Sequence, residues 1–330
     1  MLNIEYRRKP PMSYFSLRHL SKSYETQTAL HDFSLELEKG EMIAIVGESG
    51  SGKSTLLRIA SGLMTQSSGE VLLNGQKIEN PAEKLVPGYD EIKLIHQDYQ
   101  LFPNSTVEEN ILRPLLLFDP AYRKKQLDRL LRELDLEAYR QRLPRQLSGG
   151  QQQKVAIAQA LAVEPEVLLL DEPFSHLDAI QKRKILQELK ELLQEMGTTV
   201  IFVTHELDDA LRLTDSVLIL QKGKLVQRGN SQSLCEHPKT RYVARLFSAI
   251  NPLPGVDHTY LRPADVKLRT KGGLLGHVVD QRFLVHYNSL FVRLKDSGLL
   301  WEVDDPQRRF TAGDRVYLHW DEEKVLRLKS

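Results

Sequence analysis

The sequence predicts an α/β fold built on a largely parallel sheet, followed by a smaller all-β domain. Short apolar runs alternate with longer helical patterns over residues 1–250, which is typical of a parallel sheet covered by helices. One apolar run leads directly into a glycine-rich loop, which indicates a buried strand that feeds a loop and a helix. Beyond residue 250 the pattern changes to short alternating strands. We therefore expect two domains, residues 1–250 and residues 251–330.

Composition indicates an ordinary globular protein. The 330-residue chain is 41% hydrophobic and 27% charged. Its formal net charge is +1, so no bulk electrostatic field draws it to nucleic acid or to anionic lipid. No apolar run approaches the ~18 residues that a membrane span needs. The single cysteine, Cys235, cannot form an internal disulfide, which fits a reducing compartment.

The pattern of the first hundred or so residues predicts several strands, with one helix between them along the sequence. Phe33, Leu35 and Leu37 alternate with polar residues, so residues 13–38 are expected to form antiparallel strands. A buried strand is expected over residues 42–46, and a helix over residues 54–63. Further strands are predicted over residues 71–73 and 92–95.

The middle of the chain predicts an amphipathic helix over residues 121–142. Its apolar positions recur at i, i+3, i+4 and i+7 and are Leu127, Leu130, Leu131 and Leu134. The arginines and lysines between them indicate a solvated face.

Two buried strands with a helix between them follow. The strands are expected over residues 167–170 and 199–203. Asp178 is placed to cap the intervening helix, and Gly197 is placed to end it.

Short alternating strands are expected in the last part of the chain, over residues 290–294, 316–320 and 325–328. The segments Asn288-Ser289 and Ala312-Gly313-Asp314 indicate turns between strands. We interpret this part as a small, partly closed β-barrel.

The glycine-rich loop fits the phosphate-binding pattern G-x-x-x-x-G-K-[ST]. Its residues are Gly47, Glu48, Ser49, Gly50, Ser51, Gly52, Lys53 and Ser54. The glycines let successive backbone N–H groups turn toward phosphate oxygens, and the positive end of the following helix faces the same anion. Lys53 is expected to reach the β- and γ-phosphates, and Ser54 to bind Mg²⁺.

Acidic residues at the end of a buried strand predict the second half of a nucleotide site. Asp171 is placed to hold the Mg²⁺ shell. Glu172, next to it, can orient and deprotonate a water molecule. His205 follows the next buried strand, at the same edge of the sheet, and could bond to the γ-phosphate.

The segment LSGGQQQK, Leu147 to Lys154, resembles the signature of the nucleotide-binding subunit of ABC transporters. The resemblance covers about residues 15–243 and keeps the family's order of motifs. Gln97 matches the Q-loop, and Tyr24 matches the aromatic residue that stacks on adenine. Residues 175–178 match the D-loop, and His205 matches the switch histidine.

The resemblance implies a fold, a reaction and a set of site residues. The fold is a P-loop ATPase domain with an antiparallel β subdomain and a helical signature subdomain. Two copies of the chain pack head to tail around two ATP molecules, so that each ATP touches the phosphate-binding loop of one copy and the signature of the other. The implied catalytic residues are Glu172, His205, Gln97 and Lys53. The implied Mg²⁺ ligands are Ser54, Gln97 and Asp171. Further ATP contacts are implied for Tyr24, Thr55, Ser148, Gly149, Gly150, Gln151, Asp178 and residues 47–54.

Residues 261–266, LRPADV, are similar to the element that opens the β-barrel tail, or TOBE domain, of some ABC importers. Those importers carry iron, sulfate, molybdate, polyamines or sugars, and the short tail here favours the substrates other than sugars. The resemblance implies an ATPase subunit at the cytoplasmic side of the inner membrane. It would be attached to two transmembrane permease subunits and served by a substrate-binding protein, without nucleic acid.

Two alternatives stay open. The chain could be an ABC ATPase without a transport role, in DNA repair or on ribosomes, although it has neither a long inserted coiled coil nor two ATPase units. The β tail could also sense a regulatory ligand rather than only extend a dimer contact.

Overall fold

The computed structural model describes residues 13–84, 87–175 and 177–329. Its contacts divide the chain into two compact units, with the division between Asn230 and Ser231. The β-rich part of the second unit begins at Asn251, after two short helices. The domain boundary at residues 250 and 251 therefore stays a prediction.

The first unit contains two sheets. The antiparallel sheet has the strand order β2-β1-β4-β5, and the larger sheet has the order β10-β9-β3-β8-β7-β6. The strands of the first sheet are β1 (Phe15–Ser23), β2 (Thr28–Leu37), β4 (Ser68–Leu73) and β5 (Gln76–Lys77). Those of the second are β3 (Met42–Val46), β6 (Ile92–Ile95), β7 (Val167–Asp171), β8 (Thr199–Thr204), β9 (Val217–Gln221) and β10 (Lys224–Gly229). The predicted strands in this part of the chain are confirmed.

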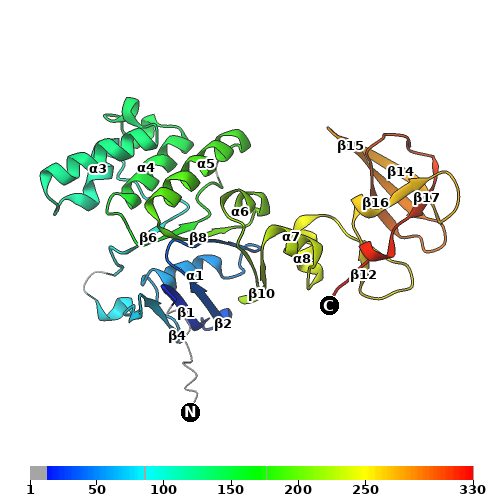
Figure 1. Ribbon diagram of the computed structural model, residues 1–330, viewed down its shortest axis with the longest axis horizontal. Coiled ribbons are helices and arrows are strands. Elements are labelled where there is room, and N and C mark those ends of the chain that lie inside the picture. The colour runs from blue at the N-terminus through cyan, green and yellow to red at the C-terminus, as the bar shows by residue number, and fades with distance from the viewer. Residues whose placement is uncertain (1–12, 85–86, 176, 330) are drawn as a thin grey trace, which may run out of the picture. The chain divides into compact units, whose positions relative to one another are not determined.

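Pairing and burial explain the larger sheet. Strands β3, β6, β7, β8 and β9 pair in parallel, and only β10 is antiparallel. Strands β7 and β8 are buried at every residue, as expected for a parallel sheet covered on both faces. Figure 1 shows α1 and the small sheet on one side of it, and α3, α4 and α5 on the other.

The helices of the first unit are α1 (Lys53–Ala60), α2 (Val107–Leu112), α3 (Pro120–Glu133), α4 (Gly149–Leu161), α5 (Ala179–Met196) and α6 (Leu207–Leu213). Asp178 caps α5 by accepting hydrogen bonds from the backbone N–H groups of Ile180 and Gln181, and Gly197 ends it at φ 63°. Both predicted helix signals are therefore confirmed.

The predicted helix over residues 121–142 is too long. Helix α3 ends at Glu133, because Asp135 takes a left-handed backbone conformation at φ 56°. The N–H of Leu136 then bonds back to the carbonyl of Leu131 at 2.7 Å, which closes the helix end. A short 3₁₀ turn at Glu137–Tyr139 follows.

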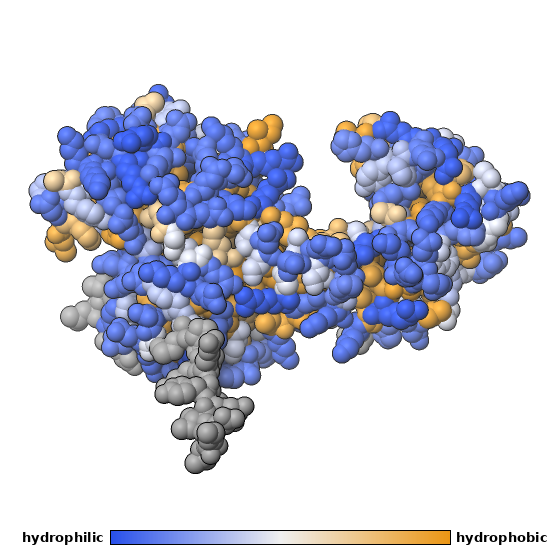
Figure 2. Space-filling model, viewed as in Figure 1, coloured by the Kyte–Doolittle hydropathy of each residue, from blue (hydrophilic) through white to orange (hydrophobic). Residues whose placement is uncertain are grey.

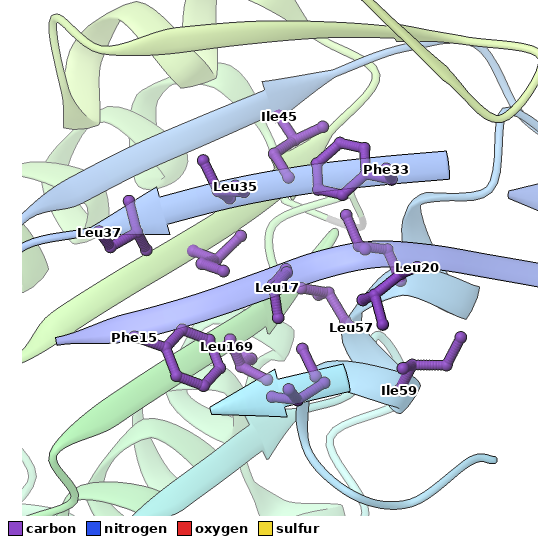
Figure 3. Packing of buried hydrophobic residues seen from close by; sticks show 14 of the residues in the cluster. Phe15, Leu17, Leu20, Phe33, Leu35, Leu37, Ile45, Leu57, Ile59 and Leu169 are labelled. Carbon is purple, nitrogen blue, oxygen red and sulfur yellow. The ribbon is translucent and has the colours of Figure 1, made fainter. Parts of the chain in front are cut away.

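The main core of the first unit lies between the two sheets. Phe15, Leu17 and Leu20 of β1 pack with Leu57 of α1 and Leu169 of β7 (Figure 3). On the face drawn in Figure 2, polar side chains cover most of the helical layer, and apolar side chains gather at its lower left edge.

The second unit consists of two short helices and two antiparallel sheets. The helices are α7 (Ser231–Glu236) and α8 (Arg241–Phe247). The three-stranded sheet has the order β11-β12-β18, and the five-stranded sheet has the order β13-β17-β14-β15-β16. Their strands are β11 (Asn251–Pro252), β12 (Thr259–Leu261), β13 (Lys267–Arg269), β14 (Leu274–Leu284), β15 (Tyr287–Leu294), β16 (Leu300–Asp305), β17 (Arg315–His319) and β18 (Leu326–Arg327).

One predicted turn of the tail is wrong. Asn288 and Ser289 lie inside β15, and the chain reverses three residues earlier, between Leu284 and Tyr287. The buried Ser289 hydroxyl bonds to the Glu302 carboxylate of β16 at 2.7 Å. A neighbouring strand therefore satisfies a polar residue that in isolation favours a turn. The turn at Gly313 is confirmed, with φ 95°.

No helix in the described part of the chain is long and apolar enough to cross a membrane.

We expect the core of the second unit to respond to the loss of one buried side chain. Leu290 of β15 is fully buried in the same hydrophobic cluster as Trp301, so Leu290→Ala should lower the free energy of unfolding by about 2–5 kcal/mol. Urea denaturation followed by tryptophan fluorescence reports on this unit, because the two tryptophans of the chain, Trp301 and Trp320, both lie in it.

The matched control is Leu300→Ala, in which the same side chain is removed from a position that is 48% exposed. We expect a loss of about 0.5 kcal/mol or less. Equal losses of unfolding free energy for the two variants would contradict the burial of Leu290 in the core.

Candidate functional site

The phosphate-binding loop connects the end of β3 to the start of α1. Gly52 is the N-cap of α1 and lies at φ 101°, and Gly50 lies at φ 78°. A Cβ atom on Gly52 would lie 2.4 Å from the carbonyl oxygen of Ala29. Glycine is therefore required by both backbone conformation and space, and the loop can turn its N–H groups toward an anion.

Lys53 is buried at the base of this loop. Its Nζ donates to the carbonyl oxygens of Gly47 at 2.8 Å and Glu48 at 3.1 Å. The same nitrogen lies 3.3 Å from Oε1 of Glu172. This cation is thus held at the loop and within reach of both a bound phosphate and the acidic pair.

Asp171 and Glu172 lie where β7 ends. The Ser54 hydroxyl donates to Oδ1 of Asp171 at 2.9 Å, which brings the hydroxyl and the carboxylate to one point. Burial raises the pKa of Asp171, although the bond from Ser54 opposes the shift. A nearby cation stabilises the ionised form of a carboxylate whose pKa is raised by burial.

Glu172 takes an uncommon backbone conformation, with φ 45°. Its N–H donates to the carbonyl of Val203 at 3.0 Å, and Oε2 lies 2.7 Å from Nδ1 of His205. These contacts hold the carboxylate between Lys53 and His205. A left-handed non-glycine residue that is held by its surroundings is a feature of many functional sites.

A pocket of about 400 Å³ brings most of the predicted residues together. Its walls are formed by Tyr24, Gln27, Ala29, Ser49, Gly50, Gly52, Lys53, Ser54, Thr55, Gln97 and Glu172. Gln97 enters it with its amide bonded to the Ser175 hydroxyl at 3.2 Å. The Tyr24 side chain is 43% exposed, so a face of the ring is available for stacking.

Sequence reasoning missed Gln27 and Ala29. Gln27 lies on the short connection before β2 and Ala29 is the second residue of that strand, and no motif marks either of them. The carbonyl of Gln27 accepts the N–H of Tyr24 at 2.8 Å, so this turn positions the tyrosine. Only its proximity to the aromatic residue could have indicated the role.

The signature segment lies elsewhere in the same unit. Ser148 caps α4, with Gln151 completing a reciprocal pair of bonds: the Ser148 N–H donates to Oε1 of Gln151 at 2.9 Å, and the Gln151 N–H donates to Oγ of Ser148 at 3.4 Å. Ser148, Gly150 and Gln151 line a second pocket, of about 250 Å³. This pocket shares no lining residue with the first.

The remaining predicted residues lie around these two pockets. Gly149 is the first residue of α4. Gly47 and Ser51 are in the phosphate-binding loop, and a Cβ atom on Gly47 would lie 2.3 Å from the carbonyl oxygen of Leu220. Asp178 lines neither pocket and uses its carboxylate as a helix cap. His176, beside it in the predicted D-loop, lies outside the described residues.

Comparison with known families agrees with this geometry. Residues 30–175 match the family model described as "ABC transporter", and residues 260–328 match the model of the TOBE domain. The chain is 35% identical over 321 residues to the spermidine/putrescine import ATP-binding protein PotA of Bacillus cereus, covering 94% of this chain and 97% of the relative. It is 33% identical over 354 residues to the protein of the same name from Haemophilus influenzae, covering 93% and 94%.

Solved structures give the same result over about two thirds of the chain. The dimeric post-hydrolysis structure of the ATP-binding cassette MJ0796, bound to ADP and Pi, is 33% identical at a TM-score of 0.59 and covers 66% of this chain and 98% of that chain. The cbiO1 protein of Clostridium perfringens, part of the cbiONQ ABC transporter complex, is 30% identical at a TM-score of 0.61, covering 67% and 90%. The chain therefore belongs to the ABC transporter family, as an ATP-hydrolysing, ATP-binding subunit of the importer type with a C-terminal TOBE domain.

Proposed function

We propose that two copies of this chain bind two ATP molecules head to tail and hydrolyse them to drive import of a polyamine through partner permeases. The observation that carries the proposal is the separation of the two phosphate-friendly segments. The phosphate-binding loop and the Ser148 segment line different pockets of one chain, so one copy alone offers ATP only half of its contacts. A second copy supplies the other half.

The signature fits a γ-phosphate presented by the other copy. The first N–H groups of a helix have no partners within the helix and attract anions. In α4 the Ser148 hydroxyl and the Gln151 amide satisfy part of this need. Ser148, Gly149, Gly150 and Gln151 would thus receive the terminal phosphate, and its loss after hydrolysis would remove the bridge between the copies.

Glu172 is the proposed general base. Its carboxylate lies at the pocket that Lys53 and the phosphate-binding loop form, where a water could be aligned with the γ-phosphate. His205 holds one oxygen of this carboxylate and Lys53 lies at the other, so orientation comes from both sides. When ATP binds, Lys53 would neutralise charge on its β- and γ-phosphates. Gln97, which lines the same pocket, would sense the same phosphate.

Ser54, Asp171 and Gln97 are the proposed ligands of Mg²⁺. A hydroxyl, a carboxylate and an amide oxygen fit a hard cation that takes few protein ligands and completes its shell with phosphate and water. The 2.9 Å contact between Ser54 and Asp171 shows that two of these donors already meet at one point. Bound Mg²⁺ supplies charge neutralisation on the phosphates.

The polyamine assignment comes from the relatives, which match this chain over nearly its whole length and are named for spermidine and putrescine import. The solute itself would be selected by a substrate-binding protein and by two transmembrane permease subunits. The chain would then act at the cytoplasmic side of the inner membrane as a peripheral subunit, with no role for nucleic acid.

A hollow beside Gln97 is the proposed docking place for a permease helix. It measures about 300 Å³, and its walls include Ile95, Tyr99, Phe102 and Pro114. The mixture of apolar and aromatic side chains suits a short helix of a membrane protein. Because Gln97 follows His96 of this wall, docking and ATP binding would be coupled through one loop.

A regulatory role for the tail is a second candidate, favoured by a pocket in the second unit. The pocket measures about 430 Å³ and its walls include Val266, Leu268, Tyr287, Asp304 and Asp305. Burial and the neighbouring Glu302 raise the pKa of Asp304, so a bound cation would be favoured there. The walls also carry Lys267, His286 and Arg309, so an organic cation would bind the two aspartates beside these basic side chains.

Glu172→Gln should lower the ATP turnover number by about 100-fold or more, because the amide cannot take a proton from water. The variant should also trap an ATP-bound dimer, which gel filtration with Mg-ATP would detect. Normal turnover by this variant would exclude Glu172 as the base.

The trapped dimer allows a test of the signature. Ser148→Asp, added to Glu172→Gln, keeps a good helix cap for α4 but places a negative charge where the γ-phosphate would bind. We expect this double variant to stay monomeric with Mg-ATP. A dimer of unchanged stability would contradict the proposed bridge.

Tyr24→Ala should weaken ATP binding by about 1 kcal/mol, roughly fivefold in Kd, because the stacking surface is lost. Tyr24→Phe keeps the ring and should bind ATP as the native chain does. The measurement is a titration with a fluorescent ATP analogue, and equal affinities for all three proteins would remove Tyr24 from the site.

If the tail senses the solute, putrescine should bind the full chain, and Asp304→Asn should weaken that binding about tenfold, the usual effect of losing one charge pair. Asp296→Asn, at an exposed position of the same unit, is the matched control. Calorimetric titration without detectable heat for the native chain would exclude this role.

A further inference from the structure

Lys182 is a buried cation and the fourth residue of α5. Its side chain is 9% exposed, and its Nζ lies 2.8 Å from Oε1 of Glu206 and 3.1 Å from Oδ2 of Asp209. Burial lowers the pKa of Lys182, but the bonds to Glu206 and Asp209 outweigh it and raise that pKa. The lysine therefore remains charged and joins α5 to α6.

Glu206 is shared between this lysine and His205. The oxygen that Lys182 binds, Oε1, also lies 3.9 Å from Nε2 of His205. The other ring nitrogen, Nδ1, lies 2.7 Å from Oε2 of Glu172. His205 is thus placed between two carboxylates, one facing each nitrogen of its ring.

The distances show which partner Glu206 holds. Oε1 is at hydrogen-bond distance from Lys182 and beyond that distance from His205. Asp209, whose side chain is 8% exposed, holds the lysine from a second direction. If the lysine lost its charge, the imidazole of His205, 3.9 Å away, would be left as a side-chain partner for this oxygen.

We propose that Lys182 is a positioning residue: it retains the Glu206 carboxylate and so leaves Nε2 of His205 available to the γ-phosphate. The inference rests on the proposed function, because it assumes that His205 takes part in turnover. Without Lys182, Glu206 closes the 3.9 Å gap and holds the ring through its second nitrogen. ATP would still bind, since Lys182 and Glu206 line neither the ATP pocket nor the signature pocket.

The central variant is Lys182→Met, which keeps a long side chain and removes the charge. We expect kcat for ATP hydrolysis to fall about tenfold or more, while KM for ATP changes by about twofold or less. Lys182→Arg keeps a cation that can reach both carboxylates and should restore most of kcat.

Two double variants separate positioning from stability. In Lys182→Met with Glu206→Gln, the neutral amide holds the imidazole less strongly, so most of kcat should return. In Lys182→Met with Asp209→Asn, the buried unpaired carboxylate is removed. The thermal unfolding temperature should therefore return to the native value, whereas kcat should stay low. If Lys182→Met alone fails to fold, this second double variant becomes the background, and Glu206→Gln is added to it.

Each outcome supports or overturns the proposal. Native kcat in Lys182→Met overturns it, as does failure of Glu206→Gln to restore turnover in a folded background. His205→Ala tests the role of His205 separately from the role of Lys182. Full turnover by this variant refutes the proposed role of His205. Slow His205→Ala together with no rescue by Glu206→Gln refutes only the role of Lys182.

Discussion

The parallel pairing of β3, β8 and β7 is the constraint on which the site depends. Val46 pairs with Thr204, and Asp171 pairs with Val203. The phosphate-binding loop, His205 and Glu172 each follow one of these strands directly, so one edge of the sheet receives all three. A shift of register by one residue would turn each side chain to the opposite face, and the buried strands on both sides oppose such a shift.

The chemistry at that edge rests on buried charges held in pairs. Lys53 lies against Glu172, and Lys182 lies between Glu206 and Asp209, each lysine with less than a tenth of its side chain exposed. An unpaired charge in such positions would be costly, so each group constrains the orientation of the next. His205 stands between the two sets and joins Glu172 to the α5–α6 contact. The proposed base is therefore linked to residues that do not line the pocket of the phosphate-binding loop.

The proposed need for a second copy follows from the separation of two pockets. Ser148 serves its own helix as a cap, and its pocket is separate from the pocket of the phosphate-binding loop.

Much of the candidate site could be predicted from the sequence, because glycine spacing, strand-end acids and helix caps act over a few neighbouring residues. The end of α3 at Glu133 and the strand through Asn288 could not be predicted, because a left-handed Asp135 and a bond from Ser289 to Glu302 decided them.

The sequence by itself determined the phosphate-binding loop, the acidic pair after a buried strand, the capped helices and the family to which the chain belongs. These features depend on local backbone chemistry and on short motifs, which a linear pattern records. Only the tertiary structure decided that Gln27 and Ala29 line the pocket at the phosphate-binding loop and that Lys182 binds the glutamate beside His205. Those contacts join segments that are distant along the chain, and only packing between elements brings such side chains within hydrogen-bond distance.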